Sequence, residues 1–412
     1  MKYGLIGEKL GHSFSVEIHG KLADYPYELK EIAQGDLDAF FKAKDFTAIN
    51  VTIPYKEKVI PYMRQISPIA RAIGAVNTVV NQNGHLYGFN TDYHGATAMI
   101  LQAGIDVKGK KALILGTGGT AKTLSVVLAD MGVGEALFVS RTQSQTAITY
   151  QDALTHHLDA EIIVNTTPVG MFPNNDATPI DISVFPQLVG VIDVIYNPLS
   201  TKLVQNAKSR GIKATGGLYM LAAQGAYASA LFLGEKPDEA KEKKVYQEVL
   251  RDKQNIVLIG MPSSGKSTIG KSVAKALKRP FFDSDKLIVE RAGKSIPEIF
   301  EDEGEAYFRQ LEQEVTRELS KKSGVVIATG GGVVLRQENT DALKQNGVLF
   351  FLDRSIELLT PTKSRPLSQD REALKQRYTE RLPLYRSAAD VILAANGSVK
   401  AVTNQLIKEF TK

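Results

Sequence analysis

Two glycine-rich loops with different sequence patterns limit the possible folds of this chain more than any other feature. The first, which follows an apolar run at residues 111–115, reads Gly116-Thr117-Gly118-Gly119-Thr120-Ala121. The second, after an apolar run at residues 256–259, reads Gly260-Met261-Pro262-Ser263-Ser264-Gly265-Lys266-Ser267-Thr268. The first spacing is typical of a dinucleotide-binding turn, and the second is a complete Walker A P-loop. The sequence therefore predicts two nucleotide-binding units joined end to end.

Length and composition narrow the class of protein. A chain of 412 residues is long for one hydrophobic core, so two or three domains are expected. The net charge of +5 comes without a long Lys/Arg block, which argues against a nucleic-acid partner. Cysteine is absent, which excludes disulfides, thiolate metal sites and cysteine nucleophiles. No apolar stretch approaches the roughly 20 residues of a membrane span, so no membrane partner and a cytoplasmic location are expected.

Short apolar runs alternate with helical segments along the whole chain, which predicts α/β architecture. Strands are expected at residues 3–6, 48–53, 111–115, 136–140, 161–165, 190–195 and 256–259. Helices are expected at residues 121–131, 217–233, 240–250 and 269–277. No Gly/Ser-rich or Pro-rich linker separates the two halves, so residues 251–253 are expected to form a very short connector.

The first glycine loop predicts a redox cofactor. Its missing side chains let the backbone approach a pyrophosphate, and the following helix N-terminus presents amide donors. The next predicted strand ends in Ser140-Arg141-Thr142, with arginine where an NAD-binding protein carries Asp or Glu. A guanidinium can grip a 2′-phosphate, which favours NADP over NAD. A simple tight turn and a solvated surface arginine are the alternatives.

Polar side chains gather near predicted strand ends in the first hundred residues. Ser13 and Ser15 lie at strand spacing, Thr52 and Lys56 follow an apolar strand, and Asn77 and Asp92 end further segments. Such a set of donors and acceptors suits a polyhydroxylated ligand. Reduction of a ketone needs a hydride from a cofactor and a proton from a side chain, and a Lys–Asp pair can supply the proton.

The second half carries the residues of phosphoryl transfer. The P-loop amides would hold the phosphates, Lys266 would reach the β- and γ-oxygens, and the Ser267 hydroxyl would bind Mg²⁺. Asp283 and Asp285 are expected two apart on one strand, one for the Mg²⁺ water shell and one for a substrate hydroxyl. An acidic acceptor would suit the arginines and the glycine run that follow, namely Arg309, Gly330-Gly331-Gly332, Arg365 and Arg381. For Arg309, an exposed ion pair on a helix is the alternative.

Residues 1 to about 250 resemble shikimate dehydrogenase. The resemblance rests on Ser-x-Ser, Asn50-Val51-Thr52-Ile53-Pro54-Tyr55-Lys56, Gly74-Ala75-Val76-Asn77-Thr78, Asn90-Thr91-Asp92, the glycine turn, Ser-Arg-Thr, residues 165–171 and 193–198, and residues 217–224. It implies a substrate-binding domain at residues 1–104, completed by residues 217–250, and a Rossmann-like NADP domain at residues 105–216. It assigns Lys56 and Asp92 as the catalytic pair. The substrate would be bound by Ser13, Ser15, Thr52, Asn77, Tyr196 and Gln224, and NADP by Gly116, Gly118, Gly119, Thr120, Ser140, Arg141, Thr142 and, beside the nicotinamide, Gly217.

Residues 254–412 resemble shikimate kinase, a P-loop fold similar to the nucleoside-monophosphate kinases. By that resemblance Asp285, Arg309, Gly331 and Arg381 hold shikimate, Lys266 and Asp285 carry the chemistry, and Asp283 with Ser267 supports magnesium. ATP would be bound by Ser263, Ser264, Gly265, Lys266, Ser267, Thr268 and the lid residue Arg365. One position departs from the family pattern. Leu358 stands where the family carries an arginine near the nucleotide, and Lys363 is the expected replacement cation.

The two resemblances converge on one metabolite. They imply a bifunctional enzyme that reduces 3-dehydroshikimate with NADPH and then phosphorylates shikimate with ATP and Mg²⁺, towards chorismate and aromatic amino acids. The residues leave two alternatives open. One is a quinate-accepting dehydrogenase fused to the same kinase, and the other is a chain in which one domain is catalytically dead and regulatory. The oligomeric state is unknown from the sequence.

Overall fold

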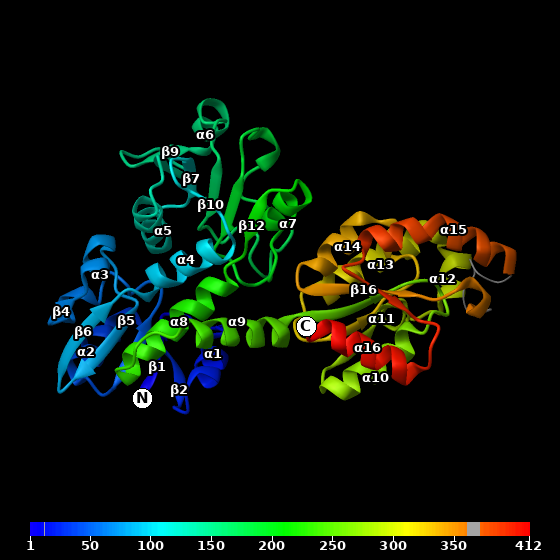
Figure 1. Ribbon diagram of the computed structural model, residues 1–412, viewed down its shortest axis with the longest axis horizontal. Helices are drawn as coiled ribbons and strands as arrows, with labels where there is room; N and C mark the ends of the chain where they lie inside the picture. Colours follow the sequence, from blue (N-terminus) through cyan, green and yellow to red (C-terminus); the bar gives the residue numbers. More distant parts are fainter. Residues whose placement is uncertain (12, 361–370) are drawn as a thin grey trace. The chain divides into compact units, whose positions relative to one another are not determined.

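The computed structural model describes residues 1–11, 13–360 and 371–412, which form two compact units, Met1–Leu250 and Arg251–Lys412 (Figure 1). Three sheets, each accompanied by helices, make up these units, which confirms the predicted α/β class. Among the described residues, no helix combines the length and the apolar character that a membrane span needs.

A mixed sheet forms the first lobe of unit 1. Its strand order is β2-β1-β3-β5-β6-β4, with β1 parallel to β2 and β3, and β5 antiparallel to β3 and β6. The accompanying helices are α1 (Ser15–Leu22), α2 (Leu37–Ala43), α3 (Pro68–Ile73) and α4 (Thr91–Gln102). The strands are β1 (Tyr3–Gly7), β2 (Tyr27–Glu31), β3 (Ala48–Val51), β4 (Gln65–Ile66), β5 (Thr78–Gln82) and β6 (His85–Phe89).

An all-parallel sheet forms the second lobe, in the order β12-β11-β10-β7-β8-β9. The crossing from one side of β7 to the other is the topological switch point at which doubly wound folds bind dinucleotides. Its helices are α5 (Gly119–Asp130), α6 (Tyr150–His156) and α7 (Lys202–Ser209). The strands are β7 (Lys111–Leu115), β8 (Glu135–Ser140), β9 (Ala147–Thr149), β10 (Ile162–Asn165), β11 (Gly190–Asp193) and β12 (Lys213–Thr215).

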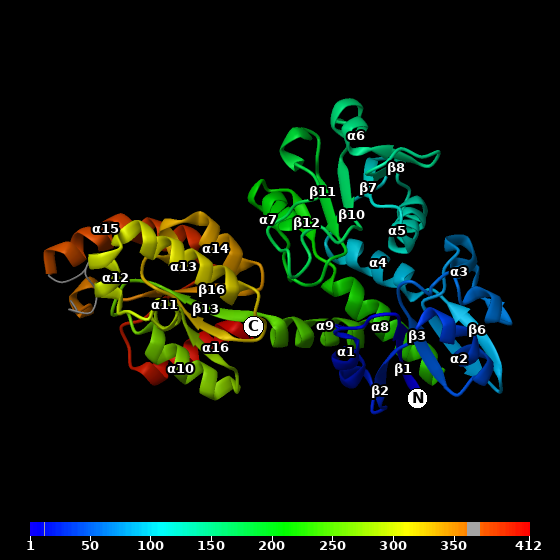
Figure 2. The ribbon, with the colours of Figure 1, turned by 180° about the vertical axis from the view of Figure 1, so that it is seen from behind.

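Helix α8 (Leu218–Leu233) contributes to the hydrophobic cores of both lobes. Met220 and Ala223 pack with the second lobe and with α4, whereas Ala228 and Phe232 pack on the first sheet. Helices α4 and α8 lie side by side in Figures 1 and 2, and a Cβ at Gly95 would lie 2.4 Å from the Met220 carbonyl oxygen. Only glycine permits so close an approach of two backbones.

Helix α9 (Glu239–Lys253) follows, and its buried Val245 and Val249 pack against α1 and Leu218. The helix ends at Lys253, and β13 (Asn255–Ile259) begins two residues later. Residues 251–253, predicted to be a connector, are therefore helical.

The third sheet is parallel and has the order β14-β15-β13-β16-β17, which places the P-loop strand at its centre. Helices α10 (Lys266–Leu277) and α16 (Val399–Phe410) cover one face, while α11 to α15 lie on the opposite side (Figure 2). Those helices are α11 (Ser284–Ala292), α12 (Ile296–Asp302), α13 (Gly304–Ser320), α14 (Gln337–Lys344) and α15 (Arg371–Ala388). The remaining strands are β14 (Phe281–Asp283), β15 (Val326–Ala328), β16 (Gly347–Asp353) and β17 (Val391–Ala394).

Candidate functional sites

A cavity of about 190 Å³ in unit 1 brings the predicted polar residues together. Both lobes contribute to its wall, because the segments after β3, β6 and β7 and the start of α8 all reach it. The predicted site residues that line this cavity are Ser13, Ser15, Thr52, Lys56, Asn77, Asp92, Thr120, Tyr196, Gly217 and Gln224.

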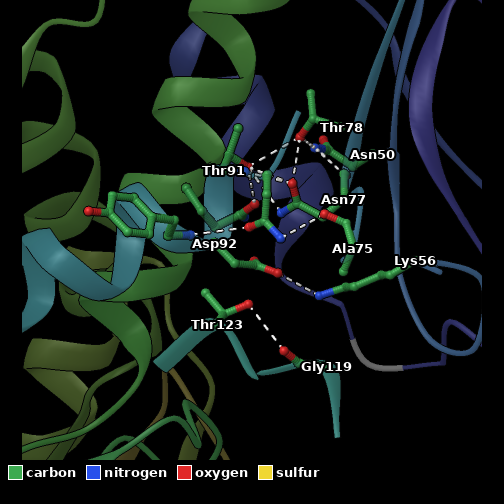
Figure 3. A network of polar contacts seen from close by, with 12 residues as sticks. Asn50, Lys56, Ala75, Asn77, Thr78, Thr91, Asp92, Gly119 and Thr123 are labelled. Atoms are coloured by element: carbon green, nitrogen blue, oxygen red, sulfur yellow. Dashed lines mark hydrogen bonds and ion pairs between the residues drawn. The ribbon is translucent and has the colours of Figure 1, made fainter. Parts of the chain in front are cut away.

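Lys56 and Asp92 form an ion pair in the lining of this cavity, with the Lys56 Nζ 2.6 Å from the Asp92 Oδ2 (Figure 3). The two side chains are only 17% and 12% exposed, so the pair is largely shielded from solvent. Lys56 follows β3 in a turn held by buried Tyr55, whose hydroxyl donates to the Ile32 carbonyl. Asp92 lies in the first turn of α4, where the helix dipole favours a carboxylate. The geometry permits proton exchange between ammonium, carboxylate and a ligand oxygen.

A buried polar network supports the Asp92 side of the cavity (Figure 3). The Asn77 Oδ1 accepts from the Thr91 amide at 2.7 Å, and the Asn77 Nδ2 donates to the Thr91 Oγ1 at 3.1 Å. Asn50 continues the network by donating to the Thr78 Oγ1 at 3.0 Å, and it accepts from the Tyr27 hydroxyl at 2.7 Å. These groups bond one another inside the core, so the orientation of Asn77 is set before any ligand binds.

The rest of the cavity lining includes hydroxyls, an amide and an aromatic ring. The Ser13 Oγ donates to the Ser15 Oγ at 2.9 Å, and the Gln224 Nε2 donates to the Leu221 carbonyl at 3.0 Å. The Tyr196 ring lies against Phe14, and burial raises the pKa of its hydroxyl. Gly217 is confined, because a Cβ there would lie 2.0 Å from the Val194 carbonyl oxygen. A side chain at this position would disrupt the entry into α8.

The first glycine loop lies at the switch point of the second lobe. Gly116 has a φ of 107°, and a Cβ there would lie 2.7 Å from the Thr166 Oγ1 of the neighbouring strand end. Gly118 caps α5 without a side-chain hydrogen bond, and a Cβ at Gly118 or Gly119 would meet no atom within 4 Å. The first amides of α5 therefore face open space, as a pyrophosphate site requires.

Ser140, Arg141 and Thr142 lie at the carboxyl end of β8 and its following turn, outside the residues that line the cavity. Ser140 is half-buried and its hydroxyl donates to the Thr142 carbonyl, whereas Arg141 and Thr142 are exposed. The second strand end of a dinucleotide fold is where the adenosine ribose is recognised. This position fits the predicted contact with a 2′-phosphate.

In unit 2 the P-loop follows the central strand β13. The Lys266 Nζ is buried and donates to the Gly260 carbonyl at 2.7 Å and to the Met261 carbonyl at 2.9 Å. Ser263 has a φ of 65°, and its hydroxyl donates to the Thr360 carbonyl at 2.7 Å. Ser264 is buried, and Thr268 lies in the first turn of α10. Arg365 and Lys363, both predicted near the nucleotide, lie outside the described residues.

The two aspartates after β14 differ from the prediction. Asp283 is the last residue of the strand and the N-cap of α11, while Asp285 lies within the first turn of that helix. The prediction that both lie on one strand is therefore wrong, because the Asp283 Oδ1 caps α11 by accepting from the Asp285 amide at 3.1 Å. The other Asp283 oxygen, Oδ2, accepts from the Ser267 hydroxyl at 2.6 Å. Asp285 approaches the glycine run instead, its Oδ1 lying 2.6 Å from a Cβ position on Gly330.

The predicted acceptor residues converge around the same glycine run. Arg309 on α13 is buried and pairs with Glu312 and Glu305, its Nη1 2.8 Å from the Glu312 Oε2 and its Nη2 2.8 Å from the Glu305 Oε1. The ion pair between Arg309 and Glu312 is therefore buried rather than exposed, whereas the Glu305 side chain is half exposed. Arg381 is also buried and donates through Nη1 to the Gly331 carbonyl at 3.0 Å.

Sequence reasoning missed several residues at these sites. Asn50 and Thr91 belong to the network behind the cavity, and a polar residue inside an apolar strand is the signal that could have indicated Asn50. Glu312 lies three residues after Arg309, a spacing that pairs side chains on a helix. Burial raises the pKa of Glu312, and Arg309 partly offsets this effect.

The fold and sites define a chain with a two-lobed dehydrogenase architecture followed by a P-loop kinase architecture. Comparison with known proteins agrees for each part. Residues 5–79 match the family model "Shikimate dehydrogenase substrate binding domain", and residues 262–411 match the model "Shikimate kinase".

Individual relatives cover the first 60% of the chain. The shikimate dehydrogenase (NADP(+)) of Clostridium perfringens (strain SM101 / Type A) is 37% identical over 264 residues, which are 97% of that protein. The crystal structure of shikimate dehydrogenase 1 from Peptoclostridium difficile is 36% identical, with a TM-score of 0.56 over 60% of this chain and 98% of its own. The Thermus thermophilus enzyme, solved with NADP(H) and shikimate, is 31% identical, with a TM-score of 0.54 over 60% and 99%.

The chain belongs to the shikimate dehydrogenase family, and it carries a shikimate kinase domain after the dehydrogenase region. It therefore combines two enzymes of the shikimate pathway in one polypeptide.

Proposed function

We propose that unit 1 reduces 3-dehydroshikimate to shikimate with NADPH, and that unit 2 transfers the γ-phosphoryl group of ATP to the 3-hydroxyl of shikimate. The observation that carries the proposal is the 2.6 Å Lys56–Asp92 pair in a cavity lined with hydroxyl and amide groups. The relatives named above, one of them solved with NADP(H) and shikimate, support the choice of ligands.

In the proposed reduction, Lys56 donates a proton to the ketone oxygen while NADPH supplies the hydride. Asp92 holds the Lys56 ammonium in place and can return a proton to it. Ser13, Ser15, Thr52, Asn77, Tyr196 and Gln224 orient the ring hydroxyls and carboxylate of the substrate. The glycine turn and Arg141 fit NADP, because α5 leaves its first amides open and Arg141 is an exposed cation at the second strand end.

In the proposed phosphoryl transfer, Lys266 leaves the loop carbonyls and neutralises charge on the phosphates. Asp285 orients the 3-hydroxyl, and Arg309, Gly331 and Arg381 hold the acceptor. Mg²⁺ would neutralise charge between the β- and γ-phosphates. The residues fit Mg²⁺, because the Ser267 hydroxyl and the Asp283 carboxylate bond one another at 2.6 Å and so present two oxygen ligands beside the P-loop. A site with few protein ligands, completed by waters and phosphates, is typical of magnesium.

The experiment is a coupled assay with 3-dehydroshikimate, NADPH, ATP and Mg²⁺, which follows NADPH oxidation and shikimate 3-phosphate together. Both products should form in the full chain, and omission of ATP should leave reduction intact. A comparison of shikimate with quinate as the substrate for the reverse reaction tests the quinate alternative. If either half has no activity on these substrates, that part of the proposed function is wrong.

A further inference from the structure

Arg354 occupies a position in unit 2 at which a ligand is expected. It directly follows β16, and β16 is the neighbour of β13, the strand that leads into the P-loop. In the order β14-β15-β13-β16-β17, the connection from β13 leads to one side of the sheet and the connection from β16 leads to the other. The boundary between β13 and β16 is therefore the topological switch point of the sheet. Ligands of open α/β sheets bind outside the carboxyl ends of the strands at such a point.

The Arg354 side chain lies against the phosphate-binding part of the loop. Its Nη1 is 3.9 Å from the place where a Cβ would stand on Gly265, the residue that caps α10. Gly265 has a φ of 95° and provides no side-chain cap, so the first amides of α10 stay open to a ligand. The guanidinium and these amides therefore border the same space.

The Arg354 side chain is not committed to a structural ion pair in the described residues. Its Nε is buried and lacks a hydrogen-bond partner among the described residues, so the desolvation of this donor is uncompensated. Its neighbours are held elsewhere. The Asp353 carboxylate faces Arg386 at 3.5 Å, and the Ser355 amide donates to the Asn396 Oδ1 at 2.9 Å. The Ser355 contact holds the backbone that follows Arg354.

Leu358, which stands where the shikimate kinase pattern has an arginine, provides no cation. Leu358 lies in the short 3₁₀ helix Ile356–Leu358 and is 44% exposed, while Leu359 packs into the core. Lys266 is bonded to loop carbonyls. Arg354 is thus an arginine whose guanidinium lies beside the P-loop residue Gly265.

We propose that Arg354 binds the phosphate chain of the nucleotide in the P-loop and replaces the nucleotide-side arginine that Leu358 cannot provide. A guanidinium is suited to this role because its planar fork contacts phosphate oxygens in pairs. The proposal rests on the proposed kinase function of unit 2. It makes Arg354 a determinant of nucleotide affinity, separate from the residues that hold the acceptor.

The test uses the full chain and three variants. Arg354→Met removes the charge at similar length, Arg354→Lys keeps the charge without the fork, and Arg386→Met removes a charge from the neighbouring exposed arginine. The measurements are the Kd for ADP by calorimetry, the KM for ATP and shikimate, and the dehydrogenase rate. Arg354→Met should weaken ADP binding and raise the KM for ATP by about tenfold or more. Arg354→Lys should lie between Arg354→Met and the wild type, while Arg386→Met, the shikimate KM and the dehydrogenase rate should stay within about twofold.

The outcomes separate this inference from the function on which it rests. If the wild-type chain binds no ADP, the proposed kinase function fails. If it binds ADP and Arg354→Met binds ADP equally well with an unchanged KM for ATP, the role of Arg354 is overturned. Equal weakening by Arg354→Met and Arg386→Met would also overturn it, because the effect would then reflect the general field of charge near β16. A thermal unfolding curve for each variant shows whether unit 2 remains folded.

Discussion

The two halves of the chain each contain a buried or nearly buried lysine at the candidate site, and the two lysines are held differently. Lys56 faces the Asp92 carboxylate, a group that can itself take up a proton. Lys266 is bonded to the carbonyls of its own loop, which do not titrate. The first arrangement suits proton transfer, and the second suits a lysine that keeps its positive charge and binds phosphate oxygens. The residue type is the same in both halves, so the hydrogen-bond partner of each lysine is what distinguishes the two proposed chemistries.

The largest expected effect tests the first arrangement. Lys56→Ala should lower the NADPH-linked rate on the order of 10²- to 10⁴-fold, because a positioned general acid is lost. Phosphorylation of added shikimate should stay at the wild-type rate. The measurement is kcat for both reactions on one preparation. A variant that reduces 3-dehydroshikimate at a near-native rate would exclude Lys56 as the proton donor.

The second arrangement is tested by Lys266→Ala, which should lower kinase kcat on the order of 10²- to 10³-fold by removing charge stabilisation of the transferred group.

Asp285→Asn should also remove phosphoryl transfer, yet it should leave ADP binding intact. Dehydrogenase activity serves as the internal control for both. Loss of ADP binding in Asp285→Asn, with shikimate binding unchanged, would contradict the role proposed for that carboxylate.

A smaller effect is expected at the cofactor of unit 1. Arg141→Asp should raise the KM for NADPH by about 10- to 100-fold, because it removes a charge-assisted phosphate contact and adds repulsion. The KM for NADH should change little, so preference shifts towards NADH. Arg210→Asp, which removes a cation elsewhere on the same lobe, is the matched control. An unchanged KM for NADPH would mean that Arg141 is an ordinary surface residue.

The smallest effect concerns pH and distinguishes the stability of the two units. All six histidines lie before residue 160, and His19 is buried between Tyr27, Tyr25 and Phe232. Burial lowers the pKa of His19 to about 3 from the ordinary 6.5, so folded unit 1 holds it neutral. This contribution to stability is present above pH 6.5 and is lost as the pH falls below it.

Between pH 7 and pH 5, wild-type unit 1 should therefore lose about 2 kcal/mol of unfolding free energy relative to the non-titrating variant His19→Phe. Chemical denaturation of both proteins at several pH values measures the difference. Because unit 2 contains no histidine, its transition provides the reference in the same sample. Parallel pH profiles for the wild type and His19→Phe would show that His19 takes up its proton without unfolding.

The sequence predicted the elements best where a buried strand ends at a glycine. The strand at residues 111–115 was placed at its observed bounds, because the buried run 112–115 leads directly into the Gly116 turn. The strand expected at residues 48–53 ends at Val51, since Pro54 has no amide for a ladder and the Tyr55 amide bonds back to the Thr52 carbonyl. The prediction that Asp285 lies on a strand is wrong because Asp283 caps α11, so the helix begins directly after the apolar run.

The sequence indicated sets of residues at the candidate sites, but it did not indicate the partners of individual residues. The structure gathers the predicted polar residues of unit 1 into one cavity, to which strand ends of both lobes and the start of α8 contribute. The pairing of Arg309 with buried Glu312, and the approach of Arg354 to Gly265, depend on distances between separate groups in the folded chain. Periodicity and local motifs carry no information on such distances. The roles of the gathered residues remain predictions.

Helix α8 has a consequence for the order in which a ribosome can complete this protein. The first sheet ends at Phe89, yet one of its hydrophobic faces is covered by Ala228 and Phe232 from α8. These residues follow about 140 positions later, which corresponds to roughly 7–30 s of synthesis at ordinary elongation rates. During that interval Leu5, Ala48 and Val80 lack their final neighbours. The first lobe, though translated first, can complete its hydrophobic core only after the second lobe has been synthesised.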